Sequence, residues 1–240
     1  MTRVVISQSM YFPWVGILEQ IRQADVFIHY DDVQYAKGFL NRVQVKQVDG
    51  QTVWMSIPLD GFKRGQKIDE IRVRPHREWV SKHLAMLHHS FAPAPHKSDA
   101  IELAEQVLET KNTRLADITR SSIRALATYF QLDHSTHFLN SAEMNVGGSS
   151  SRRLLELVKA AGGDTYVTGH GARNYLDHEM FEREGVAVEY MDYRKASYPQ
   201  PHGTFTPYVT GLDLIACCGQ QGIDYLGSKS RHWRSFLDDT

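Results

Sequence analysis

The chain has 240 residues, of which 42% are hydrophobic and 10% aromatic, and its formal net charge is −1. This length and apolar content support a real core, in one large α/β domain or two small ones. Because the net charge is near zero and the basic residues are scattered, nucleic acid and anionic membranes are not expected partners. The start, MTRVVISQ, lacks the long apolar stretch of a signal peptide, and no apolar run approaches the roughly 20 residues that span a bilayer.

The cysteine and histidine content shows no metal or cofactor signature. Cys217 and Cys218 are adjacent, so they cannot link distant segments, which fits the reducing cytoplasm that we expect for this chain. The sequence has 12 histidines but neither an HExxH nor a CxxC motif. We therefore predict no bound metal and no cofactor.

The amino-terminal part predicts a β–α–β unit. A short apolar run at 4–7 is typical of a buried parallel strand, and a helix over 14–23 and a second strand over 26–30 are expected to follow. Gln8 and Tyr11 then come after the carboxyl end of the first strand. Open α/β sheets hold their ligands at this end, so both residues are candidates for substrate binding.

The stretch from 30 to 46, YDDVQYAKGFLNRVQVK, follows the second strand and is rich in polar groups. It combines paired carboxylates, amides, a phenol and cations. Because these groups come directly after a buried strand, we expect them to form one wall of a small-molecule site. The candidate residues are Asp31, Asp32, Gln34, Tyr35, Asn41, Arg42 and Lys46.

An antiparallel insertion is predicted at about 41–74. Residues 43–46 and 53–57 alternate between apolar and polar side chains, and the DG dipeptide between them is the strongest hairpin signal in the chain. Residues 68–73 alternate in the same way. A small antiparallel element therefore interrupts the parallel arrangement.

The rest of the chain predicts helices and then a second β–α–β rhythm. Amphipathic periodicity indicates the helices, and short apolar runs indicate the strands. The helices are expected at 79–90, 99–109, 115–130, 152–161, 177–184 and from 212 on, and the strands at 165–168 and 186–190. The first three helices make up a helical segment of about 77–130. We predict one α/β domain over 1–240, with a Rossmann-like parallel sheet flanked by helices and an inserted antiparallel β-hairpin.

Two side chains suggest catalytic chemistry. His170 lies between glycines in TGHGARNY, where the backbone can approach a ligand closely and the imidazole can act as an acid or a base. A loop histidine that only caps or hydrogen-bonds is an equal alternative. Cys218, if it lies near His170, could be an activated nucleophile for acyl transfer. The other interpretation of Cys218 is a small core residue.

The remaining candidates are suited to binding. Asp31 and Asp32 can bind a cation, orient an amine or accept protons, but neighbours on an extended strand point to opposite sides, so one of them should face the site. Arg42 is suited to bind a carboxylate or a phosphate through two parallel hydrogen bonds. The loop at 198–208, YPQPHGTFTPY, can close over a site or only pack on the sheet edge. Further candidate substrate-binding residues are Asn174, Tyr175, Tyr198, Gln200, His202 and Asp213.

Nearly the whole chain resembles the WbqC-like protein family. The matching blocks are QSMYFPWVG, ADVFIHYDDVQYAKGFLNRVQVK, the AP-containing turn after 79–90, YVTGHGARNYLD and SYPQPHGTFTPYVTGLDLI. The family pattern covers Gln8, Pro13, Asp31, Asp32, Gln34, Tyr35, Asn41, Arg42, Tyr198, Gln200, Phe205, Pro207 and Asp213. The resemblance implies a setting in O-antigen, other polysaccharide or natural-product gene sets, and a glycine or aminoacyl transferase role has been suggested for members. Where many members read His-Gln-Pro, this chain has Ser7-Gln8-Ser9, so a catalytic role for that histidine does not carry over.

Residues and resemblance together predict a group-transfer enzyme that moves an acyl or aminoacyl unit, such as glycyl, to an amine in polysaccharide or natural-product biosynthesis. Arg42 and Asn41 would hold an anionic group, one of the paired carboxylates would orient the amine, His170 would take the proton and Cys218 would carry the acyl group. One alternative is a Cys/His amidase or thioesterase, and another is a non-catalytic sugar-nucleotide or metabolite-binding protein. The predicted partner is a small molecule: an amino sugar, a sugar nucleotide or an acyl or aminoacyl donor, free or carrier-bound.

Overall fold

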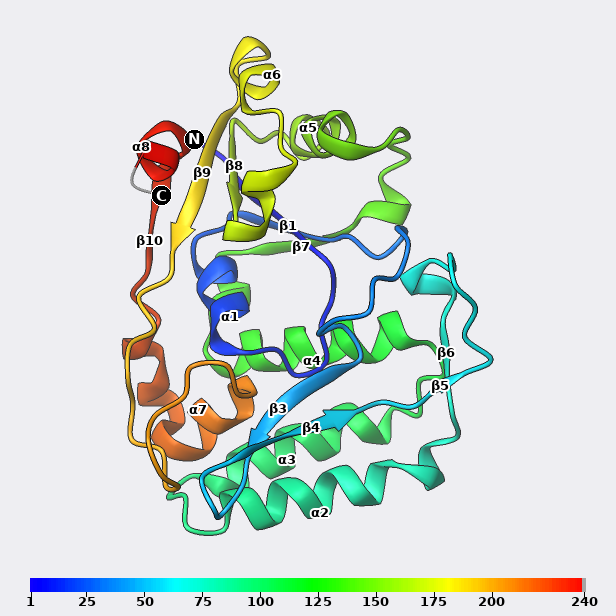
Figure 1. The fold of residues 1–240 in the computed structure, drawn as a ribbon, viewed down its shortest axis with the longest axis vertical. Coiled ribbons are helices and arrows are strands. Elements are labelled where there is room, and N and C mark those ends of the chain that lie inside the picture. Colours follow the sequence, from blue (N-terminus) through cyan, green and yellow to red (C-terminus); the bar gives the residue numbers. More distant parts are fainter. Residues whose placement is uncertain (239–240) are drawn as a thin grey trace.

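A six-stranded sheet forms the centre of the structure, a computed structural model that describes residues 1–238 (Figure 1). From one edge to the other, its strands are β10 (Lys229–His232), β9 (Ala187–Asp192), β8 (Thr165–Thr168), β1 (Arg3–Ser7), β2 (Val26–His29) and β7 (His137–Asn140). All neighbouring strands are parallel except β10, which pairs antiparallel with β9.

This strand order is the predicted Rossmann-like arrangement. The chain steps from β1 to β2 and then to β7, and afterwards returns past β1 to β8 and β9 on the other side. The order therefore reverses between β1 and β8. At such a switch point the connections after the two strands leave in opposite directions, and a crevice opens at their carboxyl ends.

Helices cover both faces of the sheet. They are α1 (Val15–Arg22), α2 (Val80–Phe91), α3 (Lys97–Glu109), α4 (Leu115–Tyr129), α5 (Ser150–Ala160), α6 (His178–Arg183), α7 (Gly211–Cys218) and α8 (Trp233–Asp238). Helices α5, α6 and α8 lie on one side of the sheet, and α1 and α4 on the other, where α2, α3 and α7 add a further layer (Figure 1).

The strands divide their side chains between two apolar cores. Val5 and Phe27 belong to the core shared with α1 and α4, whereas Val4, Ile6 and Ile28 belong to the core under α5 and α6. This alternation follows from the period of two along a strand. Because both faces are covered by helices, the parallel strands read as continuous apolar runs in the sequence.

The predicted insertion is antiparallel, as two small sheets. β3 (Arg42–Lys46) pairs with β4 (Thr52–Ser56), and β5 (Leu59–Asp60) pairs with β6 (Arg72–Val73). The alternating run at 68–73 is not one strand, because its first half is a 3-10 turn. The N–H groups of Ile68 and Asp69 donate to carbonyls of the loop after β2, at Val33 and Asp31, so a tertiary partner overrides the local pattern.

Three elements have no clear sequence signal. β7 is an edge strand with exposed residues, β10 reads KSRH, and α8 is short. An edge strand buries less apolar surface than a central strand, so it needs no apolar run in its sequence. Hydrophobic periodicity therefore does not reveal the edge strands.

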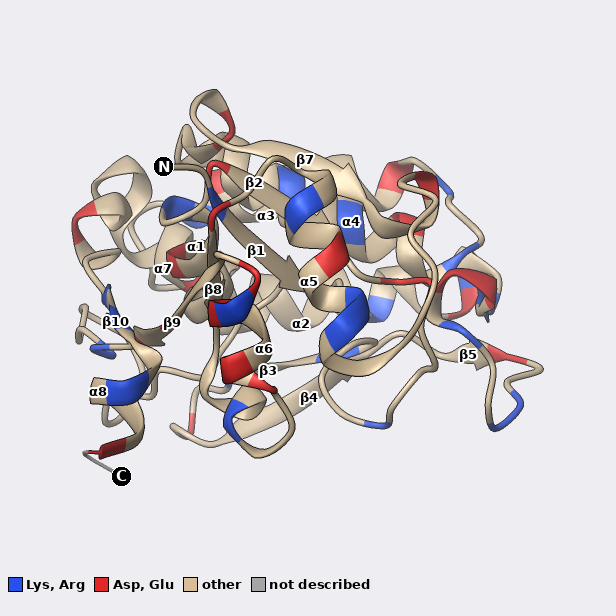
Figure 2. Ribbon diagram, turned by 90° about the horizontal axis from the view of Figure 1, so that it is seen from above, with Lys and Arg blue, Asp and Glu red and all other residues tan. Residues whose placement is uncertain are grey.

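The charges of the described residues are mixed over the surface. Figure 2 shows Lys and Arg segments interleaved with Asp and Glu segments around the ribbon. None of the helices within residues 1–238 is both long and apolar enough to cross a bilayer.

Candidate functional site

A cavity of about 650 Å³ opens at the carboxyl ends of β1 and β8. It lies at the switch point of the strand order, where sheets of this kind hold ligands. We call it the sheet-end cavity. Its walls come from the loops after β1, β2 and β8 and from the first turn of α5. The polar residues that line it are Ser7, Gln8, Gln20, Tyr30, Gln34, Ser150, Tyr166, Thr168 and Tyr175.

The lining of the sheet-end cavity is neutral. None of its lining residues is Asp, Glu, Lys, Arg, His or Cys. Burial raises the pKa of Tyr30 and of Tyr166, so both phenols are protonated at neutral pH. Phenols, amides and hydroxyls can both donate and accept, so this cavity suits a ligand part that is polar but uncharged.

A second cavity, of about 560 Å³, opens in the insertion. We call it the hairpin cavity. Gln34 lines both cavities, so the two are adjacent. The hairpin cavity differs in charge, because it is lined by three cations, Lys37, Arg42 and Arg64.

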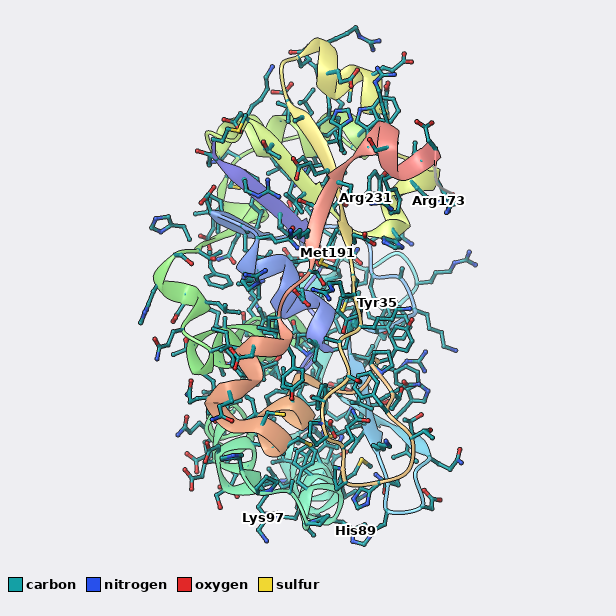
Figure 3. The ribbon with its side chains drawn as sticks, turned by 90° about the vertical axis from the view of Figure 1, so that its left-hand side faces the viewer. Tyr35, His89, Lys97, Arg173, Met191 and Arg231 are labelled. Atoms are coloured by element: carbon teal, nitrogen blue, oxygen red, sulfur yellow. The ribbon has the colours of Figure 1, made fainter. Side chains whose placement is uncertain are left out.

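Hydrogen bonds within the insertion hold the polar groups of the hairpin cavity. The Tyr35 hydroxyl donates to Asn41 Oδ1 at 2.8 Å, and Tyr35 lies with the insertion in Figure 3. Arg42 Nε donates to the Gly38 carbonyl at 2.7 Å, and the guanidinium lies 4.4 Å from the centre of the Trp54 ring. Within residues 1–238, the hydrogen bond that the Arg42 guanidinium makes is the one from Nε, so its two terminal nitrogens can pair with an anion.

The paired carboxylates point to opposite sides of the sheet. Asp31 is fully buried and accepts from Ser9 and, at 2.7 Å, from Arg120 Nε on α4. Asp32 pairs with Arg153 on α5. Neither carboxylate lines the sheet-end or the hairpin cavity. Together they tie the carboxyl end of β2 to helices on both faces, as expected for neighbours in an extended segment.

The Asp32–Arg153 pair also supports the wall of the sheet-end cavity. Burial alone would raise the pKa of Asp32, but hydrogen bonds from Arg153 and Ser141 outweigh it and hold the pKa below its usual range. The Arg153 guanidinium lies 5.1 Å from the centre of the Tyr30 ring. Asp32 is therefore placed to position Tyr30 through Arg153.

Five predicted substrate-binding residues form a buried network outside both cavities. Lys46 Nζ donates to Gln200 Oε1 at 2.9 Å and to the Thr204 carbonyl at 2.5 Å. Asp213 Oδ1 accepts from Gln200 Nε2 and from the Tyr198 hydroxyl, each at 2.9 Å. The network fastens the 198–208 loop to β3 and α7. Its predicted members are Lys46, Tyr198, Gln200, His202 and Asp213.

His170 and Cys218 lie on separate elements, and no hydrogen bond joins them in the described structure. His170 begins the 3-10 helix η5 (His170–Asn174), and its Nε2 lies 3.0 Å from the carbonyl of Met191. Met191 lies on β9 (Figure 3). Cys218 ends α7 inside the helical core. Burial raises the pKa of Cys218, which is the opposite of what an activated thiolate needs.

The sheet-end and hairpin cavities bring together part of the predicted set and add residues that the sequence does not reveal. Gln8 and Tyr175 line the first cavity, and Tyr35, Asn41 and Arg42 line the second. Tyr11 is buried instead, with its hydroxyl 3.0 Å from His83 Nδ1, and Asn174 is exposed outside both cavities.

The polar residues added to the sheet-end cavity come from α1 and α5, from β8, and from the carboxyl ends of β1 and β2. Thr168 is the last residue of β8, so the carboxyl-end rule could have found it. Tyr166 reads as a core residue, and Gln20 and Ser150 reach the cavity only because α1 and α5 pack beside it. Residues 1–238 contain no group of three His, Cys, Asp or Glu side chains placed to hold a metal ion.

The fold and the two adjoining cavities define an α/β protein built like those that hold small molecules at a sheet switch point. Residues 8–225 match the model of the WbqC-like protein family, and the chain belongs to that family. It is 33% identical over 230 residues to the uncharacterized protein Rv1507c of Mycobacterium tuberculosis (strain ATCC 25618 / H37Rv), a match that covers 94% of this chain and 98% of the relative. No solved structure matches the chain.

Proposed function

We propose that the protein is a group-transfer enzyme that holds an acyl or aminoacyl donor across the two adjoining cavities and passes the unit directly to an amine. The observation that carries this proposal is the shared wall at Gln34, where a neutral cavity meets a cationic one. A donor with a polar, uncharged body and an anionic group would match both halves. The resemblance to a family for which aminoacyl transfer has been suggested points the same way.

In this proposal the hairpin cavity binds the anionic group of the donor. Arg42 would pair with it through its terminal nitrogens, and Lys37 and Arg64 would add positive charge. Phe62 also lines this cavity and is 41% exposed, so it offers a ring beside these cations. Such a combination suits an anionic group attached to a flat ring, as in a nucleotide.

The sheet-end cavity would hold the unit that is transferred. Gln8, Tyr30 and Tyr175 would orient its carbonyl and the incoming amine. The amine nitrogen forms a bond to the acyl carbon while the bond from that carbon to the leaving group breaks, and the leaving group departs as an anion with the electron pair. The proton of the amine passes to water, because the lining holds no carboxylate, imidazole or thiol.

Direct transfer is favoured over a covalent intermediate on Cys218. The thiol lies in the helical core, its pKa is raised by burial, and it lines neither cavity. The same geometry offers no support for an amidase or thioesterase that uses Cys218 and His170.

A non-catalytic metabolite-binding protein is the second candidate. The observation that favours it is the neutral lining of the sheet-end cavity, whose only titratable groups are phenols. Product formation separates the two candidates. An amide product that requires both donor and amine supports transfer, and tight binding without product from any donor and amine pair supports a binding protein.

Charge removal at Arg42 tests the donor site. With UDP-glucose as the sugar-nucleotide probe, we expect Arg42→Gln to raise the Kd by about tenfold, because one charge-assisted hydrogen-bond pair to the diphosphate is lost. Isothermal titration calorimetry measures the change. Arg183→Gln is the matched control, since Arg183 is exposed on α6 and lines neither cavity.

A second measurement tests the direct route. Cys218→Ala should keep the wild-type transfer rate, and mass spectrometry of the wild type with donor alone should show no acyl adduct. Equal UDP-glucose affinity in Arg42→Gln and the wild type would overturn the donor site, and an adduct on Cys218 would overturn direct transfer.

A further inference from the structure

A third cavity lies on the α4 side of the sheet, at the carboxyl ends of β2 and β7. Its volume is about 330 Å³, and we call it the β7 cavity. It shares no lining residue with the sheet-end cavity or the hairpin cavity. The residues that carry the argument are His29, Asp117, Arg120, Arg124 and Glu143.

The hydrogen bonds around His29 determine which ring nitrogen carries the proton. Ser9 Oγ donates its hydrogen to Asp31 Oδ2 at 2.8 Å, and it also lies 2.8 Å from His29 Nδ1. A hydroxyl has one hydrogen, so Ser9 Oγ must accept from His29, and Nδ1 must carry the proton. The other nitrogen, Nε2, is then a lone-pair acceptor.

Nε2 of His29 is a buried acceptor with no hydrogen-bond partner in the described structure. The side chain is 2% exposed and lines the β7 cavity. Burial, and then the charges of Arg120 and Arg124, lower the pKa of His29 to about 3, so the ring is neutral. A buried polar atom is normally paired, so an orphaned acceptor beside a cavity points to a donor that a ligand supplies.

The same cavity also contains unused donors. Arg120 Nε is paired with Asp31 at 2.7 Å, whereas the buried Nη2 of Arg120 has no partner among the described residues. Arg124 lies one helical turn further along α4, with its guanidinium 5.3 Å from the centre of the Phe138 ring. One acceptor and two guanidinium groups therefore border a single small space.

We propose that the β7 cavity binds a short carboxylate that carries a hydrogen-bond donor on the adjoining carbon. The carboxylate would pair with Arg120 Nη2 and Arg124, and a hydroxyl or ammonium hydrogen would be donated to His29 Nε2. Asp117 and Glu143 also line the cavity and would repel an ion with two negative charges, which favours a carboxylate over a phosphate dianion. This site is independent of the proposed donor site.

Three ligands of nearly equal size test the proposal. Glycolate has a hydroxyl on the carbon next to the carboxylate, glycine has an ammonium there, and acetate has neither. We expect glycolate, glycine or both to bind the wild-type protein at least about fivefold more tightly than acetate, because acetate leaves His29 Nε2 unpaired. Titrations followed by NMR chemical shifts give the three Kd values, and the ratio between glycolate and glycine shows which donor the site prefers.

Two variants locate the binding. Arg124→Gln should raise the Kd of the preferred ligand by about tenfold, because one guanidinium is lost from the cavity. Arg124 is exposed, so its replacement leaves the buried Asp31–Arg120 pair in place. Arg183→Gln, on α6, should leave the affinity unchanged. His29→Phe keeps a flat ring but removes the acceptor, so the preference over acetate should disappear.

An NMR measurement of the wild type reads His29 directly, whether or not His29→Phe folds. Long-range proton–nitrogen correlation spectra should show His29 as the Nδ1–H tautomer, with an Nε2 signal that moves when the preferred ligand is added. The proposal is overturned by an Nε2–H tautomer, by equal affinity for acetate and the other two ligands, by an unchanged affinity in Arg124→Gln, or by no saturable binding of any of the three.

Discussion

Two buried histidines of this protein are neutral. His29 is 2% exposed and His83 is 6% exposed, and their rings are held by Ser9 and by Tyr11 with the Ser56 carbonyl. Burial lowers the pKa of His29 to about 3 and that of His83 to about 4. In the unfolded chain both should titrate near the ordinary value of about 6.5, so folding is linked to pH.

We expect these two residues to make the protein less stable in mild acid. Below about pH 6.5 the unfolded chain binds a proton at each site while the folded chain does not, so the free energy of unfolding falls as the pH is lowered. Each histidine contributes at most about 1.4 kcal/mol per pH unit in this range, and the contribution of His83 shrinks as the pH approaches its folded pKa of about 4. Urea unfolding at several pH values measures the slope.

The variant His83→Gln isolates one of the two contributions. Its slope between about pH 6 and pH 4 should be smaller than that of the wild type by about 1 kcal/mol per pH unit. Replacement of His88, an exposed residue on the same helix, is the control and should leave the slope as it is. An unchanged slope in His83→Gln would contradict the assignment of His83 as a neutral buried group.

The 198–208 loop is the element that the buried network holds in place. Lys46 Nζ donates to Gln200 and Thr204, and the Ser90 hydroxyl donates to the Lys46 carbonyl at 2.5 Å. His202 Nε2 lies 2.8 Å from the Ser90 carbonyl. The loop is therefore attached to β3 and α2 through polar contacts, and Lys46 is the residue common to most of them.

Lys46→Met should loosen this loop. The substitution keeps the length and apolar stem of the side chain, but it removes the Lys46 donor from the Thr204 carbonyl and one of the two donors of Gln200 Oε1, which keeps the N–H of Thr206. An unpaired buried acceptor costs about 1–3 kcal/mol. We expect faster amide exchange across 198–208, measured by hydrogen exchange with mass spectrometry. Lys97→Met is the control, because Lys97 is exposed at the start of α3, away from the loop (Figure 3). Equal protection of the loop in wild type and Lys46→Met would refute the anchoring role.

The two apolar cores are parts of one folding unit, we infer, because the same strands build both. β1 contributes Val5 to one core and Val4 and Ile6 to the other, and β2 contributes Phe27 and Ile28 in the same way. If one core opened alone, the strands that lie between the two cores would lose the apolar contacts on one of their faces. The 240-residue chain should therefore behave as a single domain.

Denaturation can test this unity. Trp79 is buried in the core with α1 and α4, and Trp233 packs against the core under α5 and α6. Single-tryptophan variants that keep one or the other should report the same urea midpoint, and far-ultraviolet circular dichroism should follow the same curve. Two separate midpoints would show that the cores unfold independently and would contradict the single domain.

Local patterns were enough to predict the architecture. Apolar runs and amphipathic periods are properties of neighbouring residues, so they located β1, β2, β8 and β9, the hairpin, and helices α1 to α7. They failed at 68–73, where the loop after β2 takes the backbone hydrogen bonds, at the edge strands β7 and β10, which need little apolar surface, and at the short helix α8.

The role of each polar residue was decided by the tertiary structure. In the sequence, Arg42 and Lys46 look alike, since both are cations in the same predicted insertion and in the same polar stretch. The fold leaves Arg42 on the wall of a cavity, whereas the 198–208 loop and α7, more than 150 positions away, surround Lys46 with partners. His29 shows the converse, because nothing in the run VFIH reveals that one ring nitrogen faces a cavity without a partner. A polar side chain can be satisfied by a ligand or by a distant part of its own chain, and only the folded coordinates show which.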